Sequence, residues 1–223
     1  SKPNKNLPTI FIWPEGALSG IYFDELKKYN DIFFNNFSHK HIIIMGITTR
    51  NLKNNEIYNS MVVVNNNLDL ISQYNKIKLV PFGEFLPFDK FFNNLGFKKI
   101  TYGYESFSSG KRREIISINQ DKFQIKFLPL ICYEIIYSGL INLNKKNFNF
   151  IINISEDGWF GNSIGPDQHF SHSIFRAIEE GENIIRSTNN GISAVINSNG
   201  IIINKLESTQ RGVIEVNRYK KNK

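Results

Sequence analysis

Residues 127–134 read Phe127-Leu128-Pro129-Leu130-Ile131-Cys132-Tyr133-Glu134, a strongly apolar run that ends on the chain's single cysteine and a carboxylate. Its apolar character predicts a strand that ends at the cysteine. Cys132 then lies at a strand-to-helix turn, where a helix dipole would favour a thiolate. The run therefore offers Cys132 as a candidate nucleophile, with a small buried hydrophobic residue as the alternative.

The rest of the chain alternates many strand-like runs with a few helical ones. The predicted strands are residues 9–12, 42–49, 57–64, 68–80, 115–118, 123–132, 148–154, 192–196 and 201–203. Nearly helical spacing of apolar residues predicts a helix over 23–37. Pro166 is well placed to begin a second helix that carries Phe170, Ile174, Ala177 and Ile178 on one face. No repeat or linker divides residues 1–223, so we expect one mixed α/β domain.

The composition limits the function without deciding it. The chain has 223 residues, 41% of them hydrophobic, which supports a proper core and excludes disorder as its main state. A net charge of +7 favours anionic partners, whether a membrane surface, nucleic acid or acidic substrates. One cysteine excludes an intrachain disulfide and a cysteine-rich zinc site. No apolar run approaches the roughly 20 residues that a membrane-spanning helix needs.

Two further charged residues fall in or just after strand-like runs. Glu15 follows the run 9–12, and a carboxylate there is either a general base or a solvated loop residue. Lys76 alternates with apolar neighbours, and such a lysine either stabilises an oxyanion or extends to solvent. Neither residue decides its role alone.

Whole motifs carry more information than these single residues. Trp13-Pro14-Glu15, Tyr74-Asn75-Lys76 and Ile131-Cys132-Tyr133-Glu134 follow one another in an order that resembles the Glu–Lys–Cys triad of the nitrilase, or carbon–nitrogen hydrolase, superfamily. Within it, the chain most resembles the apolipoprotein N-acyltransferase family. The motifs that carry this narrower resemblance are KLVPFGEFLP at 78–87, DGWFG at 157–161, GPDQH at 165–169 and RSTNNG at 186–191.

The resemblance implies a nitrilase-like αββα sandwich and a ping-pong acyl transfer that needs no cofactor or metal. Cys132 would attack an acyl ester of a phospholipid, while Glu15 takes the thiol proton and Lys76 stabilises the oxyanion. The thioester would then pass its acyl group to the α-amine of the diacylglyceryl-cysteine at an apolipoprotein N-terminus. The implied location is the bacterial inner membrane, with the domain facing the periplasm.

The resemblance also implies supporting residues around the triad. Glu84 and Glu134 would be supporting carboxylates, and Tyr133 would assist beside the nucleophile. Trp159 and Phe160 would contact the substrate. A phenylalanine-rich stretch would form a lipid-facing lid, its alternative being a small core under a loop; its members are Phe82, Phe85, Phe88, Phe91, Phe92 and Phe97.

Other charged or metal-ligating residues give weaker signals. His169 and His172 lie three residues apart on a predicted helix without a third ligand at a recognisable spacing, so packing or a structural hydrogen bond is expected. The basic clusters at 111–113 and 218–221 lack a nucleic-acid-binding fold or an aromatic ladder. We expect them to be solvated or to contact anionic lipid headgroups, and expect no nucleic-acid partner.

The chain departs from the family pattern at several points. It lacks the family's membrane helices and the first βα unit ahead of Trp13, so we expect a partial, truncated domain. Glu156 and Gly158 stand where the family pattern has Asn and Ala. Two alternatives to the acyltransferase stay open. One is a nitrilase-type amidase acting on a small amide, and the other is an inactive remnant or membrane-surface binder.

Overall fold

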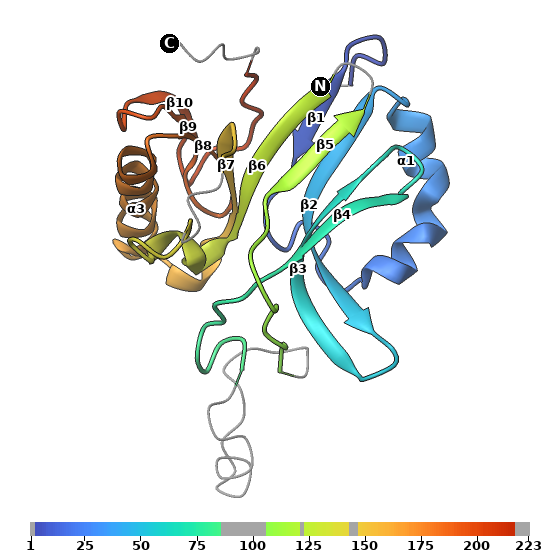
Figure 1. The fold of residues 1–223 in the computed structure, drawn as a ribbon, viewed down its shortest axis with the longest axis horizontal. Helices are drawn as coiled ribbons and strands as arrows, with labels where there is room; N and C mark the ends of the chain where they lie inside the picture. Colours follow the sequence, from blue (N-terminus) through green and yellow to red (C-terminus); the bar gives the residue numbers. More distant parts are fainter. Residues whose placement is uncertain (1–2, 86–105, 121–122, 143–146, 217–223) are drawn as a thin grey trace, which may run out of the picture.

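The computed structural model describes residues 3–85, 106–120, 123–142 and 147–216 (Figure 1). Within them, strands form two sheets. The first has the order β1-β2-β3-β4, with bounds Thr9–Ile12, His41–Asn51, Glu56–Val64 and Leu70–Asn75. The second has the order β10-β9-β8-β7-β6-β5; in chain order its strands are β5 (Ile116–Gln120), β6 (Phe123–Ile131), β7 (Phe150–Glu156), β8 (Asn183–Asn189), β9 (Ser193–Ile196) and β10 (Ile202–Leu206).

Among the described residues, the helical elements are short except for one. In chain order they are η1 (Phe23–Tyr29), α1 (Asn30–Asn36), η2 (Cys132–Ile136), η3 (Gly158–Phe160) and α3 (Gly165–Glu180). In Figure 1, α1 lies outside the first sheet and α3 lies outside the second, with both sheets between them. No helix among the described residues is long and apolar enough to cross a membrane.

Three apolar clusters account for this layering. In β2, Ile43, Met45 and Ile47 pack towards η1 and α1, whereas Ile42 and Ile44 pack towards the second sheet, because successive side chains of a strand point to opposite faces. A third cluster joins the second sheet to α3 through Phe170 and Ala177. The order of layers is therefore helix, sheet, sheet, helix, which confirms the predicted αββα sandwich.

Parallel pairing brings several strand ends to one edge of the second sheet. β6, β7 and β8 run parallel to one another, whereas β5 and β9 pair antiparallel with them. Residues that follow these three strands at their carboxyl ends therefore lie side by side. In the first sheet, β1 runs parallel to β2. The pairing continues one residue past the end of β1, because the backbone N–H of Trp13 donates to the backbone oxygen of Ile44 at 2.8 Å.

Several predicted elements need correction. The run 68–80 is a strand only to Asn75, after which the chain leaves the sheet. The helix over 23–37 is a 3-10 segment followed by a short α-helix, with Tyr29 and Ile32 exposed. Ile178 was predicted on the buried face of α3 but is exposed. Strand β8 was not predicted at all, because Arg186 and its polar neighbours interrupt the apolar pattern.

Candidate active site

The three residues predicted to form a triad converge between the two sheets. Glu15 follows β1, Lys76 follows β4 and Cys132 follows β6. All three side chains are buried, Lys76 almost completely at 1% exposure. Such burial of charged groups is expensive unless each has a partner, so the contacts between them define the site.

Lys76 lies between two carboxylates. Its Nζ is 2.9 Å from Glu84 Oε2 and 3.5 Å from Glu15 Oε1. Glu84 Oε2 also accepts a hydrogen bond from the backbone N–H of Val80 at 2.9 Å. This bond closes the loop that leads from Lys76 to Glu84. The resemblance implied that Glu84 is a supporting carboxylate, and the structure places it against Lys76.

Asn59 is a polar residue of this cluster that sequence reasoning missed. Its Nδ2 donates to Glu15 Oε1 at 2.6 Å and to Glu84 Oε1 at 2.7 Å, so one amide bridges both carboxylates. Its backbone oxygen accepts the N–H of Lys76 at 2.9 Å. A signal was available in the strand alternation, because Asn59 lies on the same face as Met61 and Val63, which pack towards the second sheet.

Burial and charge shift the pKa values of this cluster in opposite directions. Burial disfavours the charged form of Lys76, but the charges of Glu15, Cys132 and Glu84 outweigh it and raise the lysine pKa. Burial raises the pKa of Glu15 above its ordinary value of 4.5, and the Lys76 charge offsets only part of that rise. Lys76 therefore stays protonated, and Glu15 is a stronger base than an exposed glutamate.

The Cys132 thiol lies beside the Glu15 carboxylate. Burial, followed by the negative charge of Glu15, raises the pKa of Cys132 to about 12. The expectation that a helix dipole would favour a thiolate was therefore wrong. The helical element η2 has only five residues, too few to offset the loss of hydration and the adjacent carboxylate. The resting group is a neutral thiol, which needs a base during attack.

The backbone of Cys132 adopts an unusual conformation that a buried network holds. Its φ of +50° lies in the left-handed region, which costs energy for a residue other than glycine. The carbonyl oxygen of Cys132 lies 3.3 Å from His169 Nε2 and 3.4 Å from Asn153 Nδ2. His169 Nδ1 is in turn 2.9 Å from Asp157 Oδ1, and Arg186 is paired with Asp157 Oδ2 at 2.8 Å.

This network explains the motifs that contain His169, Asp157 and Arg186. Burial lowers the pKa of His169, while the His169 hydrogen bond and the Arg186 charge lower the pKa of Asp157 against its burial. His169 thus makes the structural hydrogen bond that the sequence predicted. His172, three residues along α3, does not take part in these bonds. Among the described residues no group of three His, Cys, Asp or Glu side chains could hold a metal ion.

Glu134 connects the loop of Lys76 to the turn of Cys132. It is fully buried and accepts hydrogen bonds from Tyr74 Oη at 2.7 Å and from the backbone N–H groups of Ile77 at 3.0 Å and Ile131 at 2.9 Å. Arg113 pairs with it at 3.0 Å. Glu134 thus ties the backbone just after Lys76 to the backbone just before Cys132.

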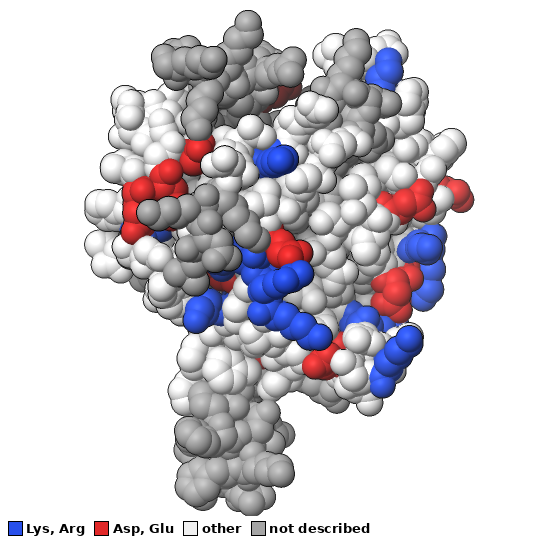
Figure 2. Space-filling model, viewed as in Figure 1, with Lys and Arg blue, Asp and Glu red and all other residues white. Residues whose placement is uncertain are grey.

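The pairing of Arg113 corrects one expectation about the basic cluster 111–113. That cluster was expected to be solvated. Arg112 fits this, because its side chain is 79% exposed and pairs with Glu114. The Arg113 side chain is only 11% exposed and is enclosed by Glu134 and Tyr74. On the face in Figure 2, positive and negative side chains are interspersed. The second basic cluster, 218–221, lies outside the described residues.

The described residues that were predicted to contact substrate, to form the lid or to assist beside the nucleophile are exposed or half-buried. Trp159 is 62% exposed and Phe82 44%, and Tyr133 is also exposed, whereas Phe85 and Phe160 are half-buried. The rings of Tyr133 and Phe160 each lie within 6 Å of His169, which places them next to the Cys132 turn. Four members of the phenylalanine-rich stretch lie outside the described residues: Phe88, Phe91, Phe92 and Phe97.

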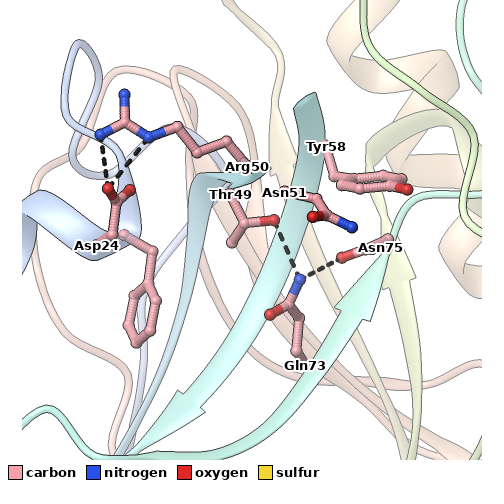
Figure 3. A pocket seen from close by; sticks show the side chains of 8 residues that line it. Asp24, Thr49, Arg50, Asn51, Tyr58, Gln73 and Asn75 are labelled. Atoms are coloured by element: carbon pink, nitrogen blue, oxygen red, sulfur yellow. Dashed lines mark hydrogen bonds and ion pairs between the residues drawn. The ribbon is translucent and has the colours of Figure 1, made fainter. Parts of the chain in front are cut away.

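A hollow of about 270 Å³ lies on the face of the first sheet that points away from the triad (Figure 3). Thr49, Tyr58 and Asn75 line it, and by strand alternation they face away from Asn59 and the triad. In Figure 3, Gln73 donates to both Thr49 and Asn75, while Arg50 pairs with Asp24. These polar groups satisfy one another. Among them, Asn75 is the last residue of β4 and directly precedes Lys76, and Gln73 holds its side chain.

The amino-acid sequence of this chain is similar to those of several known proteins. Apolipoprotein N-acyltransferases from Rickettsia prowazekii, Wigglesworthia glossinidia brevipalpis and Brucella suis are 36%, 37% and 31% identical over 210, 213 and 216 residues. The matches cover 92%, 90% and 95% of this chain, but only 41%, 40% and 40% of those proteins. The chain is homologous to these enzymes and spans about two fifths of their length.

Solved structures share the fold at low identity. Nit3 from Saccharomyces cerevisiae, a member of branch 10 of the nitrilase superfamily, has a TM-score of 0.62 at 19% identity, over 91% of this chain and 74% of that one. Glutamine-dependent NAD+ synthetase from Acinetobacter baumannii has a TM-score of 0.64 at 17% identity, over 91% and 38%. The carbon-nitrogen hydrolase family model matches residues 10–218, which include all the buried groups described above. The chain, with its Glu, Lys and Cys gathered between two sheets, belongs to the carbon–nitrogen hydrolase family.

Proposed function

We propose that this domain transfers an acyl group from a phospholipid to the N-terminal amine of a diacylglyceryl apolipoprotein, through a thioester on Cys132. The observation that carries the proposal is the buried cluster of Cys132, Glu15 and Lys76, in a chain homologous to apolipoprotein N-acyltransferases. A thioester divides one difficult ester-to-amide exchange into two easier steps.

In the first step, Cys132 Sγ attacks the ester carbonyl while Glu15 takes the thiol proton. The C–S bond forms, the ester C–O bond breaks, and Glu15 returns the proton to the departing lysophospholipid oxygen. Lys76 donates to the oxyanion of the tetrahedral intermediate, for which a fixed donor is worth about 10²–10³ in rate. Its ion pair with Glu84 holds Nζ in place throughout.

In the second step, the amine attacks the thioester carbonyl, so that a C–N bond forms and the C–S bond breaks. Glu15 accepts the proton from the amine nitrogen, and Cys132 recovers a proton as it leaves. Both steps use the same base and the same oxyanion donor, which fits a ping-pong reaction at one site. Exposed Trp159 and Phe82 offer apolar surface for the acyl chains. The proposed location is the periplasmic face of the bacterial inner membrane.

The test is the intact mass of the protein after incubation with phospholipid micelles. We expect a gain of one acyl chain that maps to Cys132 and is lost with hydroxylamine, and no gain in Cys132→Ala. A diacylglyceryl-cysteine lipopeptide should then remove the acyl group and become N-acylated. Folded protein that gains no acyl chain but hydrolyses a small amide would replace the proposal with an amidase. Absence of both reactions would refute an enzymatic role for this chain.

A further inference from the structure

Glu156, the last residue of β7, contacts the proposed base and nucleophile through its backbone. Its N–H donates to Glu15 Oε2 at 2.8 Å, and its carbonyl oxygen lies 4.0 Å from Cys132 Sγ. One carboxylate oxygen of Glu15 thus accepts a hydrogen bond from Asn59, and the other accepts one from the backbone N–H of Glu156. The position of this peptide therefore affects both the orientation of the base and the stability of its charged form.

The side chain of Glu156 fixes this peptide from the other side. Its carboxylate accepts hydrogen bonds from Asn189 Nδ2, from Asn190 Nδ2 at 3.1 Å and from the backbone N–H of Gly158 at 2.8 Å. Asn189 pairs with Glu156 in the β7–β8 register, so the carboxylate joins the ends of two parallel strands to the start of η3. Three donors on one carboxylate make a specific local clamp.

Gly158 leaves the space that this carboxylate occupies. A Cβ at position 158 would lie 2.6 Å from Glu156 Oε1, closer than such atoms pack, and 3.1 Å from Asn190 Nδ2, which is a tight contact. The backbone of Gly158 lies outside the left-handed region, so conformational strain is not the reason for glycine here. An alanine at 158 would instead expel the Glu156 carboxylate, which is the movable partner of that contact.

We propose that the Glu156 carboxylate is a positioning group for the Glu15–Cys132 pair, and that Gly158 is required because of it. The inference rests on the proposed function only in taking Glu15 as the base for Cys132. Loss of the clamp frees the Glu156 peptide from Glu15, which removes a hydrogen bond from the charged carboxylate. The base then becomes harder to ionise and less well aligned with the thiol.

Alkylation by iodoacetamide tests this without any lipid. Cys132 is the only cysteine, so the mass gain of the whole chain measures the reactivity of that thiol alone. The rate is measured across the pH range for wild type, Glu156→Ala, Gly158→Ala and the double variant. We expect the acidic limb of each single variant's profile to shift upward by about one pH unit, so that its rate is about tenfold lower than that of wild type on this limb.

The double variant separates a positioning role from a merely structural one. It should react no more slowly than either single variant, since the closest contact of a Cβ at position 158 is with the Glu156 carboxylate, which the double variant no longer has. Gly212→Ala, an exposed glycine whose Cβ would contact only Leu206, is the matched control and should leave the profile unchanged. Thermal unfolding of each variant checks the fold, and Glu156→Ala, which adds no bulk, carries the test if Gly158→Ala unfolds.

Three outcomes would overturn the inference. Additive losses in the double variant would mean that Gly158 acts independently of Glu156. A wild-type pH profile in Glu156→Ala would mean that its carboxylate positions nothing. If wild type reacted no faster than Glu15→Gln, the base assignment itself would fail, and the proposed function with it. Failure of acyl transfer from phospholipid, with the coupling intact, would refute the proposed substrate alone.

Discussion

Replacing Arg113 with alanine separates a buried ion pair from its exposed neighbour in the same basic cluster. Arg113 lies 3.0 Å from Glu134, which at an effective dielectric constant of 20 corresponds to about 5–6 kcal/mol of Coulomb attraction. Removal of one member of such a pair typically costs about 3–5 kcal/mol of unfolding free energy. Glu134 keeps Tyr74 and its backbone donors, so we take the lower value, about 3 kcal/mol.

This loss converts into a measurable temperature. For a chain of this length, 1 kcal/mol corresponds to about 2–4 °C, so Arg113→Ala should lower the Tm by about 6–12 °C. Arg112→Ala is the matched control, because Arg112 is exposed and its pair with Glu114 should shift the Tm by less than about 2 °C. Thermal unfolding at pH 7, followed by circular dichroism, measures both. Equal shifts in the two variants would show that Glu134 does not depend on Arg113.

Three further variants test the site itself. Lys76→Met should lower the rate of thioester formation by about 10²–10³-fold. It also leaves buried carboxylates without their cation, so its Tm should rise as the pH falls from 7 through the raised pKa of Glu15. Because Glu15 must be ionised to act as a base, the wild-type acylation rate should fall as the pH decreases through that same pKa. The rate of Glu15→Gln should instead grow with pH only as the thiol itself ionises, at a pKa below the wild-type value of about 12, because the variant lacks the Glu15 charge that helps to raise it; rates in a pH series check both. Gly110→Ala would place a Cβ 2.2 Å from the backbone oxygen of Asn75, next to Lys76, so the acylation rate should fall more than tenfold and calorimetry should show a lower Tm.

The sequence predicted most of the fold because apolar runs and turns are local signals. The strands around Ile42, Val62 and Leu130 were found in this way, since each contributes a continuous buried run. Strand β8 was missed because it carries Arg186, whose charge is compensated by Asp157 from a distant part of the chain. The residues next to a charged side chain in a strand do not indicate whether a distant residue will pair with it.

The same distinction applies to the candidate site. The order of the motifs predicted a triad of Glu15, Lys76 and Cys132, and the structure places these three residues together. The bridge made by Asn59 and the burial of Arg113 depend on which residues lie opposite one another across the sheets. The pKa of Cys132 depends on burial and on the adjacent carboxylate, and therefore on tertiary contacts. No spacing in the sequence carries that information.

The raised thiol pKa has a consequence for how the site would select its reactions. Glu15 and Glu84 bring two negative charges to a single Lys76 ammonium, so a thiolate on Cys132 would add a further negative charge in a buried place. The thiol therefore loses its proton only as a new bond forms. In that step the proton moves to Glu15, and negative charge moves onto the carbonyl oxygen beside Lys76, where a cation already lies. An electrophile that develops no oxyanion gains nothing from Lys76, so this arrangement favours acyl carbonyl compounds over adventitious oxidants and alkylating agents.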